Sequence, residues 1–217
     1  MQKQKKLKIL VECAVMIGLA AVLSYVFRMW QAPFGGSATL FSMVPIIIIG
    51  FRHGPVWGFG TAFVFSVMQL MIDAPQLSGW GVAGAKNMIL CVFLDYIVAF
   101  TLLGLTGFFK YAIDKNQKRG KKIMLISAAT LLVCILRYIS HVVVGAVIWY
   151  AIARAGEGEY YVEFAHTAGA WVYSAVYNLQ FMLPETIITL AAAPAVVTIL
   201  SAVGKTRGNT LQEINTD

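Results

Sequence analysis

Long runs of apolar residues restrict this chain to a membrane fold. Hydrophobic residues make up 59% of its 217 residues, charged residues make up only 12%, and its mean hydropathy is +0.74. A soluble globular domain has about 25% charged residues. Apolar runs of roughly 20 residues are long enough to cross a bilayer as helices. The sequence therefore predicts an all-α integral membrane protein.

The apolar runs predict a single domain, residues 1–217, built as a bundle of six transmembrane helices. No linker, change of composition or repeat of fixed period divides the chain. The segment from Met29 to Ser42 contains Gly, Pro and Ser and is predicted to be a loop. The predicted helices cover about residues 7–28, 43–51, 56–73, 84–110, 123–152 and 171–203.

The basic residues predict which way the bundle faces. If the N-terminus is cytoplasmic, most of the 17 lysines and arginines lie in cytoplasmic segments, and only Arg28, Lys86 and Arg154 lie in outer ones. The positive-inside rule then places both termini in the cytoplasm. The net charge of +7 is explained by this topology and by attraction to anionic lipid, so no nucleic-acid partner is indicated.

Four groups that ionise or form strong hydrogen bonds lie inside the predicted helices, namely Asp95, Arg137, His141 and Asn178. Such groups are costly in hydrocarbon and normally line the interior of a bundle, where they bind a substrate or relay ions. A helix rises about 1.5 Å per residue, and the predicted helix directions bring the four groups to the outer half of the bundle. We therefore predict one polar site there.

The fifth predicted helix carries residues of four different kinds on one face, because they are spaced by four along the sequence. They offer a cation, a switchable donor or acceptor, a gap beside the backbone and an aromatic lid. These residues are Arg137, His141, Gly145 and Trp149, and Tyr96, Tyr173 and Tyr177 accompany them on the neighbouring helices.

A structural explanation of the same residues stays open. Arg137 and Asp95 can form a structural ion pair, with His141 donating to a carbonyl. Trp149 also fits an interfacial anchor, which is the commoner role of tryptophan at that depth.

Other polar and sulfur-containing residues are given lesser roles. Glu185 follows Pro184, where a helix kink would free carbonyls, and its structural and functional roles are equally open. Arg52 and His53 lie in a short cytoplasmic turn and are interpreted as a positive-inside mark only. The cysteines are interpreted as small buried hydrophobes; they are Cys13, Cys91 and Cys134.

Ala14 and Gly18 form a stripe of small residues on the first predicted helix. Such a stripe lets another helix approach closely, either within the bundle or from a partner protein. Because the stripe has no polar task, we interpret it as a surface for docking a partner, with internal packing as the competing explanation.

The sequence contains no visible catalytic signature. The motifs H-E-x-x-H, Walker A and G-x-S-x-G are absent. The chain is therefore not predicted to be an enzyme, and no catalytic residue, metal or cofactor is indicated. It also lacks the two similar halves that are common in secondary transporters.

Four segments carry a more specific signal, in this order along the chain: GGSATLFSMVPI (Gly35 to Ile46), LDYIVAF (Leu94 to Phe100), LRYISHVVVGAVIW (Leu136 to Trp149) and WVYSAVYN (Trp171 to Asn178). Together they resemble the thiamine transporter family of energy-coupling factor substrate-binding subunits. The resemblance covers roughly residues 8–200.

The resemblance implies which residues bind the ligand. Asp95 stands where the family has an acidic residue that binds the aminopyrimidine, and Arg137 falls where some members have Lys. An aminopyrimidine offers N–H donors and ring acceptors, and a thiazolium cation prefers an aromatic face. The other implied ligand-binding positions are Tyr96, His141, Gly145, Trp149, Tyr173 and Asn178, and Tyr177 lies on the same helix as the last two.

The aromatic lid of the family is less well matched. The first outer loop lacks the tryptophan that some members carry, which leaves Trp30 or Phe34 as substitutes. Trp80 is the stand-in for an aromatic residue before the fourth predicted helix.

The resemblance also implies a partner and a location. The chain would capture thiamine outside a bacterial cytoplasmic membrane and work with a transmembrane coupling protein and two ATP-binding-cassette ATPases. Two alternatives stay open. The ligand could be another vitamin or a thiamine precursor, or the chain could be an autonomous proton-coupled transporter that uses Asp95, Arg137 and His141 as a relay.

Overall fold

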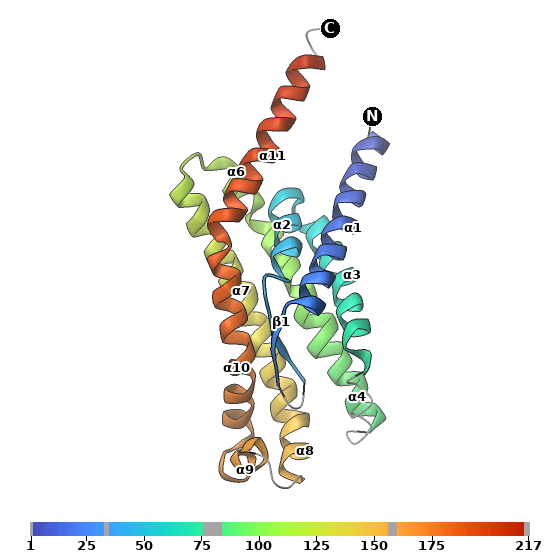
Figure 1. Cartoon of the computed structure of the whole chain (residues 1–217), viewed down its shortest axis with the longest axis vertical. Coiled ribbons are helices and arrows are strands. Elements are labelled where there is room, and N and C mark those ends of the chain that lie inside the picture. The colour runs from blue at the N-terminus through green and yellow to red at the C-terminus, as the bar shows by residue number, and fades with distance from the viewer. Residues whose placement is uncertain (1, 33–34, 76–83, 156–159, 215–217) are drawn as a thin grey trace.

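The computed structural model describes residues 2–32, 35–75, 84–155 and 160–214, which form an elongated helical bundle (Figure 1). The elements before the middle of the chain are α1 (Gln2–Val26), β1 (Arg28–Gln31), β2 (Ser37–Thr39), α2 (Val44–His53) and α3 (Pro55–Asp73). One continuous helical stretch then contains α4 (Ala85–Cys91), the π-helical η2 (Val92–Val98), α5 (Ala99–Thr101), the 3-10 helical η3 (Leu102–Phe109) and α6 (Lys110–Lys115). The rest of the chain forms α7 (Arg119–Val144), the π-helical η4 (Gly145–Trp149), α8 (Tyr150–Ala155), α9 (Tyr160–Thr167), α10 (Ala170–Ala191) and α11 (Ala193–Ile214).

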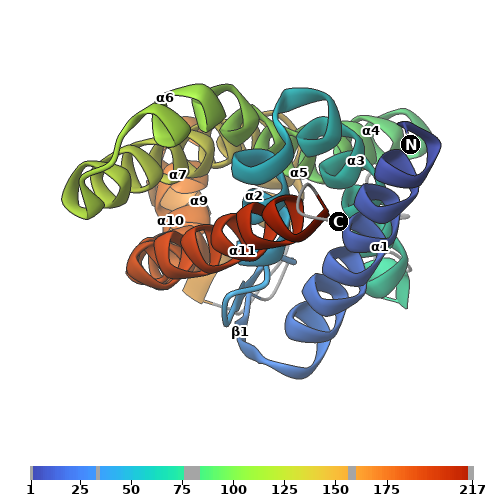
Figure 2. The same ribbon diagram turned by 90° about the horizontal axis from the view of Figure 1, so that it is seen from above.

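The helices pack as two groups joined through the middle of the bundle. On one side α1 packs against α2 and α3, and on the other α7 packs against α10, with η3 in contact with α2, α3 and α7 between them (Figure 2). The free ends of α1 and α11 lie at the same end of the molecule (Figure 1). A buried apolar core runs through the contacts between these helices.

Within the described residues, four helical stretches are long and apolar enough to cross a membrane, and the bent pair α10 and α11 adds a fifth if it is one span. The helix α2 has only 10 residues, or about 15 Å at the usual rise, which is half of a typical hydrocarbon core. The predicted all-α membrane class is therefore confirmed, but length and composition do not establish six spans. The four stretches are Gln2–Val26, Pro55–Asp73, Ala85–Lys115 and Arg119–Ala155.

The segment predicted as a loop contains a two-stranded antiparallel hairpin, β1 and β2, with Trp30 opposite Ala38. The first helix therefore ends at Val26 and does not reach Arg28. The backbone of Gly35 has a φ of 100°, in the region that glycine adopts without steric cost. Strands of four and three residues are too short to produce a clear alternating pattern in the sequence.

The last predicted helix is divided into α10 and α11. The helix α10 continues past Pro184, and the chain bends by 42° between Ala191 and Ala193. Pro194 lies in the first turn of α11, where a missing N–H costs no hydrogen bond. This proline therefore starts a new helix at the bend.

The turn between α2 and α3 connects two helices of the bundle through side-chain contacts. Arg52 forms an ion pair with Glu12 of α1, and His53 Nε2 lies 3.1 Å from the same carboxylate. The interpretation of Arg52 and His53 as a topological mark only is therefore incomplete, because they also tie α2 to α1. The three cysteines are buried and free, as expected.

Candidate ligand-binding site

A single cavity collects the polar residues that the sequence singled out. The space between its lining residues and across its open mouth, part of which is open solvent, is about 800 Å³. All nine residues predicted to bind a ligand line it, which are Asp95, Tyr96, Arg137, His141, Gly145, Trp149, Tyr173, Tyr177 and Asn178. The fold thus brings together residues from three predicted helices.

Both π-helical segments carry cavity residues. Asp95 and Tyr96 lie in η2, and Gly145 and Trp149 lie in η4. A π-helical segment inserts extra backbone into a turn and changes the direction in which its side chains point, and such segments are frequent at functional sites. The even spacing by four therefore describes the stripe on α7 only up to Gly145.

Asp95 pairs with His141 across the cavity wall. The distance from His141 Nδ1 to Asp95 Oδ1 is 2.9 Å, and their side chains are only 10% and 14% exposed. Among the described residues, His141 Nε2 is buried and has no hydrogen-bond partner. A buried ring nitrogen without a partner costs free energy, so this atom is available to a ligand in the cavity.

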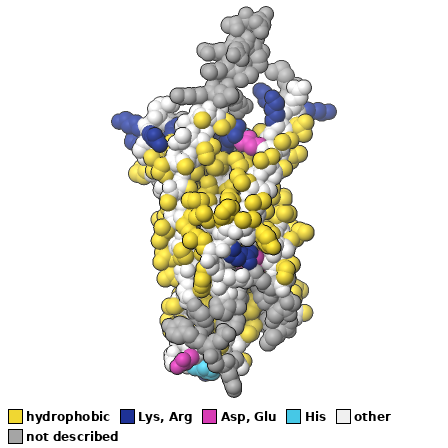
Figure 3. All heavy atoms as spheres, in the orientation of Figure 1, with side chains coloured by type: hydrophobic (Ala, Val, Ile, Leu, Met, Phe, Trp, Pro, Cys, Tyr) yellow, Lys and Arg dark blue, Asp and Glu magenta, His cyan; other side chains and the backbone are white. Residues whose placement is uncertain are grey.

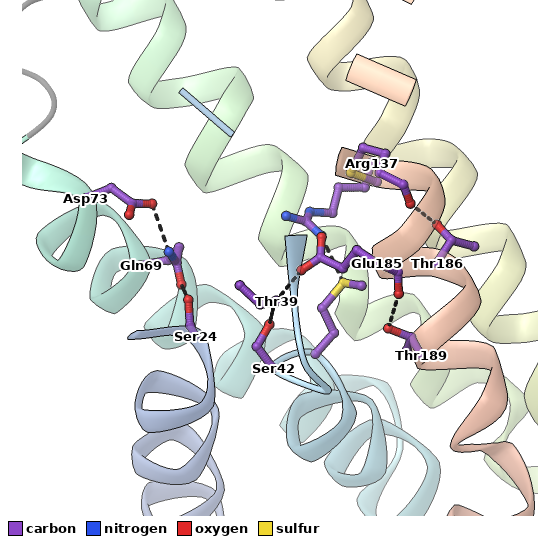
Figure 4. Close-up of polar contacts among 11 residues, drawn as sticks. Ser24, Thr39, Ser42, Gln69, Asp73, Arg137, Glu185, Thr186 and Thr189 are labelled. Carbon is purple, nitrogen blue, oxygen red and sulfur yellow. Dashed lines mark hydrogen bonds and ion pairs between the residues drawn. The ribbon is translucent and has the colours of Figure 1, made fainter. Parts of the chain in front are cut away.

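Arg137 pairs with Glu185 and not with Asp95, so the structural ion pair considered from the sequence is wrong. Arg137 Nη1 donates to Glu185 Oε2 at 2.7 Å (Figure 4). The guanidinium also lies 4.2 Å from the ring centre of Phe100, a cation–π distance. Arg137 and Asp95 therefore have separate partners, Glu185 and His141.

Glu185 also holds the hairpin. Thr39 Oγ1 of β2 donates to Glu185 Oε1 at 2.6 Å, and Thr39 and Ser42 hydroxyls are 2.5 Å apart (Figure 4). All three residues line the cavity. The sequence singled out Glu185 without assigning it to the site, because nothing local reveals that α10 and β2 meet there.

A second polar chain reaches the cavity from α1 and α3, and the sequence analysis missed it. Ser24 Oγ donates to Gln69 Oε1 at 2.6 Å, and Gln69 Nε2 donates to Asp73 Oδ2 at 2.8 Å (Figure 4). Asp73 in turn forms an ion pair with Arg28 at 2.7 Å. The spacing of Gln69 and Asp73 by four on an apolar helix was the available signal.

Gly145 is required by a close helix approach. A Cβ atom at this position would lie 2.1 Å from Ser174 Oγ and 3.0 Å from Asn178 Nδ2. Asn178 Nδ2 in turn donates to the carbonyl oxygens of Ser174 and His141. The gap predicted beside this backbone is therefore occupied by α10, which brings Asn178 to the cavity.

We expect Gly145→Ala to lower the stability of the protein. Ser174 Oγ would have to leave its 2.7 Å hydrogen bond to Val142 O, and overpacking typically costs about 1–3 kcal/mol. The apparent melting temperature of purified protein, followed by intrinsic fluorescence, should fall by several degrees. The double variant Gly145→Ala/Ser174→Ala removes the clashing hydroxyl and should recover part of the loss. An unchanged melting temperature in the single variant would contradict this packing.

Aromatic rings form the rest of the cavity wall. Tyr173 and Tyr177 stack with ring centres 6.0 Å apart, and Phe181 lies edge-on to His141 at 5.7 Å. Trp149 also lines the cavity, so a purely interfacial anchor does not describe its position. Phe181 is an aromatic wall residue that the sequence analysis did not identify.

The predicted lid residues are placed less clearly. Trp30 lies on β1 with 38% of its surface exposed. Phe34 and Trp80 lie outside the described residues.

Comparison with known proteins supports the family suggested by the sequence. The family model described as thiamine transporter protein matches residues 10–204. The thiamine transporter ThiT of Bacillus subtilis (strain 168) is 32% identical over 192 residues, which cover 87% of this chain and 89% of the relative. ThiT of Lacticaseibacillus paracasei is 26% identical over 204 residues, covering 92% and 91%.

A solved structure has the same fold. ThiT from Listeria monocytogenes aligns with a TM-score of 0.65 and 22% identity over 93% of this chain and 97% of that one. At this identity the likeness shows the fold alone, whereas the family model covers most of the sequence. The chain belongs to the thiamine transporter protein family.

Proposed function

We propose that this protein is the thiamine-binding subunit of an energy-coupling factor importer. The observation that carries the proposal is the cavity, where the Asp95–His141 pair faces aromatic walls. A carboxylate and a ring nitrogen suit the donors and acceptors of an aminopyrimidine, and aromatic faces suit a thiazolium cation. The names of the two relatives from Bacillus subtilis and Lacticaseibacillus paracasei support the same ligand.

In this proposal each part of the cavity binds a different part of thiamine. Asp95 accepts from the aminopyrimidine, and His141 Nε2 supplies a further polar contact. Asn178 Nδ2 already donates a hydrogen bond to Ser174 O. In this proposal the side-chain oxygen of Asn178 therefore binds the ligand. Trp149 and the tyrosines enclose the rings.

Titration of the purified protein with thiamine tests this function. Calorimetry measures binding directly, and the fluorescence of tryptophans near the cavity provides a second readout. Saturable binding of thiamine, with weaker binding of other vitamins, is expected. No binding of thiamine together with tight binding of another vitamin or of a precursor would assign the cavity to that ligand.

We expect Trp149→Ala to weaken thiamine more than a neutral aminopyrimidine fragment. The aromatic face acts on the cationic ring, and a desolvated cation–π contact contributes about 2 kcal/mol. The affinities of both ligands are compared by calorimetry in the original protein and the variant. Equal losses for the two ligands would make Trp149 a general wall residue.

The proposed importer needs a docking surface for its partners, and the small-residue stripe on α1 provides it. Ala14 and Gly18 are exposed, and a Cβ atom at Gly18 would meet nothing within 4 Å. Internal packing therefore does not explain the glycine. We propose that the transmembrane coupling protein, which would also carry the two ATPases, docks on this face of α1.

In the proposed orientation both termini lie in the cytoplasm of a bacterium, and α2 counts as the second of six membrane segments. Figure 3 shows basic side chains gathered toward the end of the molecule where the free ends of α1 and α11 lie, next to a broad hydrophobic band. This distribution agrees with the positive-inside rule. Cysteine accessibility to a membrane-impermeant reagent at each end would test it.

An autonomous proton-coupled transporter is the alternative in a different class. It would use the Asp95–His141 pair, since Arg137 is engaged by Glu185. Uptake by liposomes that contain this chain alone, driven by a proton gradient, would support the alternative. A requirement for partner subunits and ATP would support the importer.

A further inference from the structure

The charges that line the cavity do not cancel. Among the described lining residues, three are acidic and one is a permanent cation. They are Asp73, Asp95, Glu185 and Arg137. Which of these charges a ligand meets depends on how they are paired within the protein.

Asp73 is compensated by a residue behind the cavity wall. Arg28 Nη2 lies 2.7 Å from Asp73 Oδ1, and the two side chains are 17% and 12% exposed. Gln69 Nε2 donates to the other oxygen of the same carboxylate. A ligand therefore meets a neutral pair at this side of the cavity.

Glu185 compensates Arg137 in the same way, with less exposure to solvent. The side chains of Arg137 and Glu185 are only 4% and 3% exposed. One carboxylate oxygen accepts from Arg137 and the other from Thr39. A buried charge is tolerated when an opposite charge and hydrogen bonds accompany it, and removal of one partner leaves the other charge uncompensated.

Asp95 differs, because it pairs with a histidine and not with an arginine. In the part of the chain that the structure describes, no lysine or arginine forms an ion pair with it, and its contact is the His141 ring. The ion pairs with arginine compensate Asp73 and Glu185, and they leave the negative charge of Asp95 without a permanent cation among the described residues. That charge matches a ligand with a single positive charge.

We propose that Glu185 determines the ligand charge that the cavity accepts, because it cancels Arg137 and leaves the negative charge of Asp95 to select an organic monocation. This inference rests on the proposed thiamine function and adds to it a residue that selects by charge without having to touch the ligand. The competing explanation is that Glu185 only ties β2 to α10 through Thr39.

The test compares two ligands that differ in charge alone. One is thiamine, and the other is its neutral thiophene analogue, in which carbon replaces the charged nitrogen of the thiazolium ring. Calorimetry on the purified full chain gives the affinity ratio of cation to neutral analogue. In Glu185→Gln the uncompensated guanidinium repels the cation, and the ratio should fall about tenfold.

Arg137→Gln is the matched variant, because it removes the positive charge of the pair where Glu185→Gln removes the negative charge. It leaves the Glu185 carboxylate uncompensated, so the affinity ratio of cation to neutral analogue should rise. The absolute affinity for either ligand is not part of this prediction. The double variant Arg137→Gln/Glu185→Gln restores the net charge and should return the ratio to that of the original protein. The conservative variant Glu185→Asp keeps the charge and should also keep the ratio.

Opposite shifts in the two single variants support charge selection by Glu185. Shifts of the same sign, or unchanged ratios in both, overturn it and leave Glu185 as a structural tie. If a single variant does not fold, the double variant and Glu185→Asp decide, since a changed ratio in either also overturns the inference. The proposed thiamine function is tested separately from this inference, and it is wrong if the original protein binds neither ligand.

Discussion

Gly18→Leu is expected to abolish thiamine uptake and to leave thiamine binding by the isolated subunit intact. Close approach of a partner helix needs small side chains at a spacing of four, and a leucine would hold the two backbones apart. Gly18 is exposed, and a Cβ atom added there meets nothing within 4 Å, so the fold and the cavity should survive. Uptake is measured in cells that also contain the coupling protein and the ATPases, and docking is measured by co-purification.

Gly60→Leu is the matched control for this experiment. Gly60 is an exposed glycine on another long apolar helix, α3, and a Cβ atom there also meets nothing within 4 Å. It should retain uptake, binding and co-purification. If Gly18→Leu binds thiamine poorly but still co-purifies with its partners, the stripe belongs to the packing of the bundle and the docking proposal is wrong.

Asp95→Asn is expected to weaken thiamine binding by roughly ten- to hundredfold. The amide keeps the shape of the side chain but loses a charge-assisted hydrogen bond, which contributes about 1.5–3 kcal/mol. The Asp95 side chain is only 14% exposed, so water does not replace the lost interaction. Calorimetric titration of the purified variant measures the change.

Asp95→Glu is the control, because it keeps the charge and lengthens the side chain. It should retain more affinity than Asp95→Asn. Both variants need a melting temperature close to that of the original protein. Unchanged thiamine binding in folded Asp95→Asn would remove Asp95 from the proposed site.

Much of this architecture could be predicted from the sequence because hydrocarbon imposes simple rules. Helices must satisfy their own backbone hydrogen bonds in a membrane, and apolar runs reveal where they lie. The same cost drives Asp95, Arg137, His141 and Asn178 away from lipid. Their convergence on one cavity therefore followed from position and depth.

Local geometry was less predictable, because it depends on small differences in backbone energy. The π-helical segments that carry Asp95 and Gly145 have ordinary helical sequences. The predicted helix over residues 171–203 is bent by 42° between Ala191 and Ala193, and this bend was not predicted from the sequence. These features depend on packing between helices that are distant in the sequence.

The sequence by itself determined that polar residues face the interior, and the tertiary structure decided which of them pair. Arg137 lies beside Glu185 and Asp95 lies beside His141, although their sequence positions allowed Arg137 and Asp95 to meet. Partner choice depends on how each helix is rotated and shifted along its axis. Packing contacts such as that of Gly145 with Ser174 fix this rotation, and they involve residues from different helices that no local pattern connects.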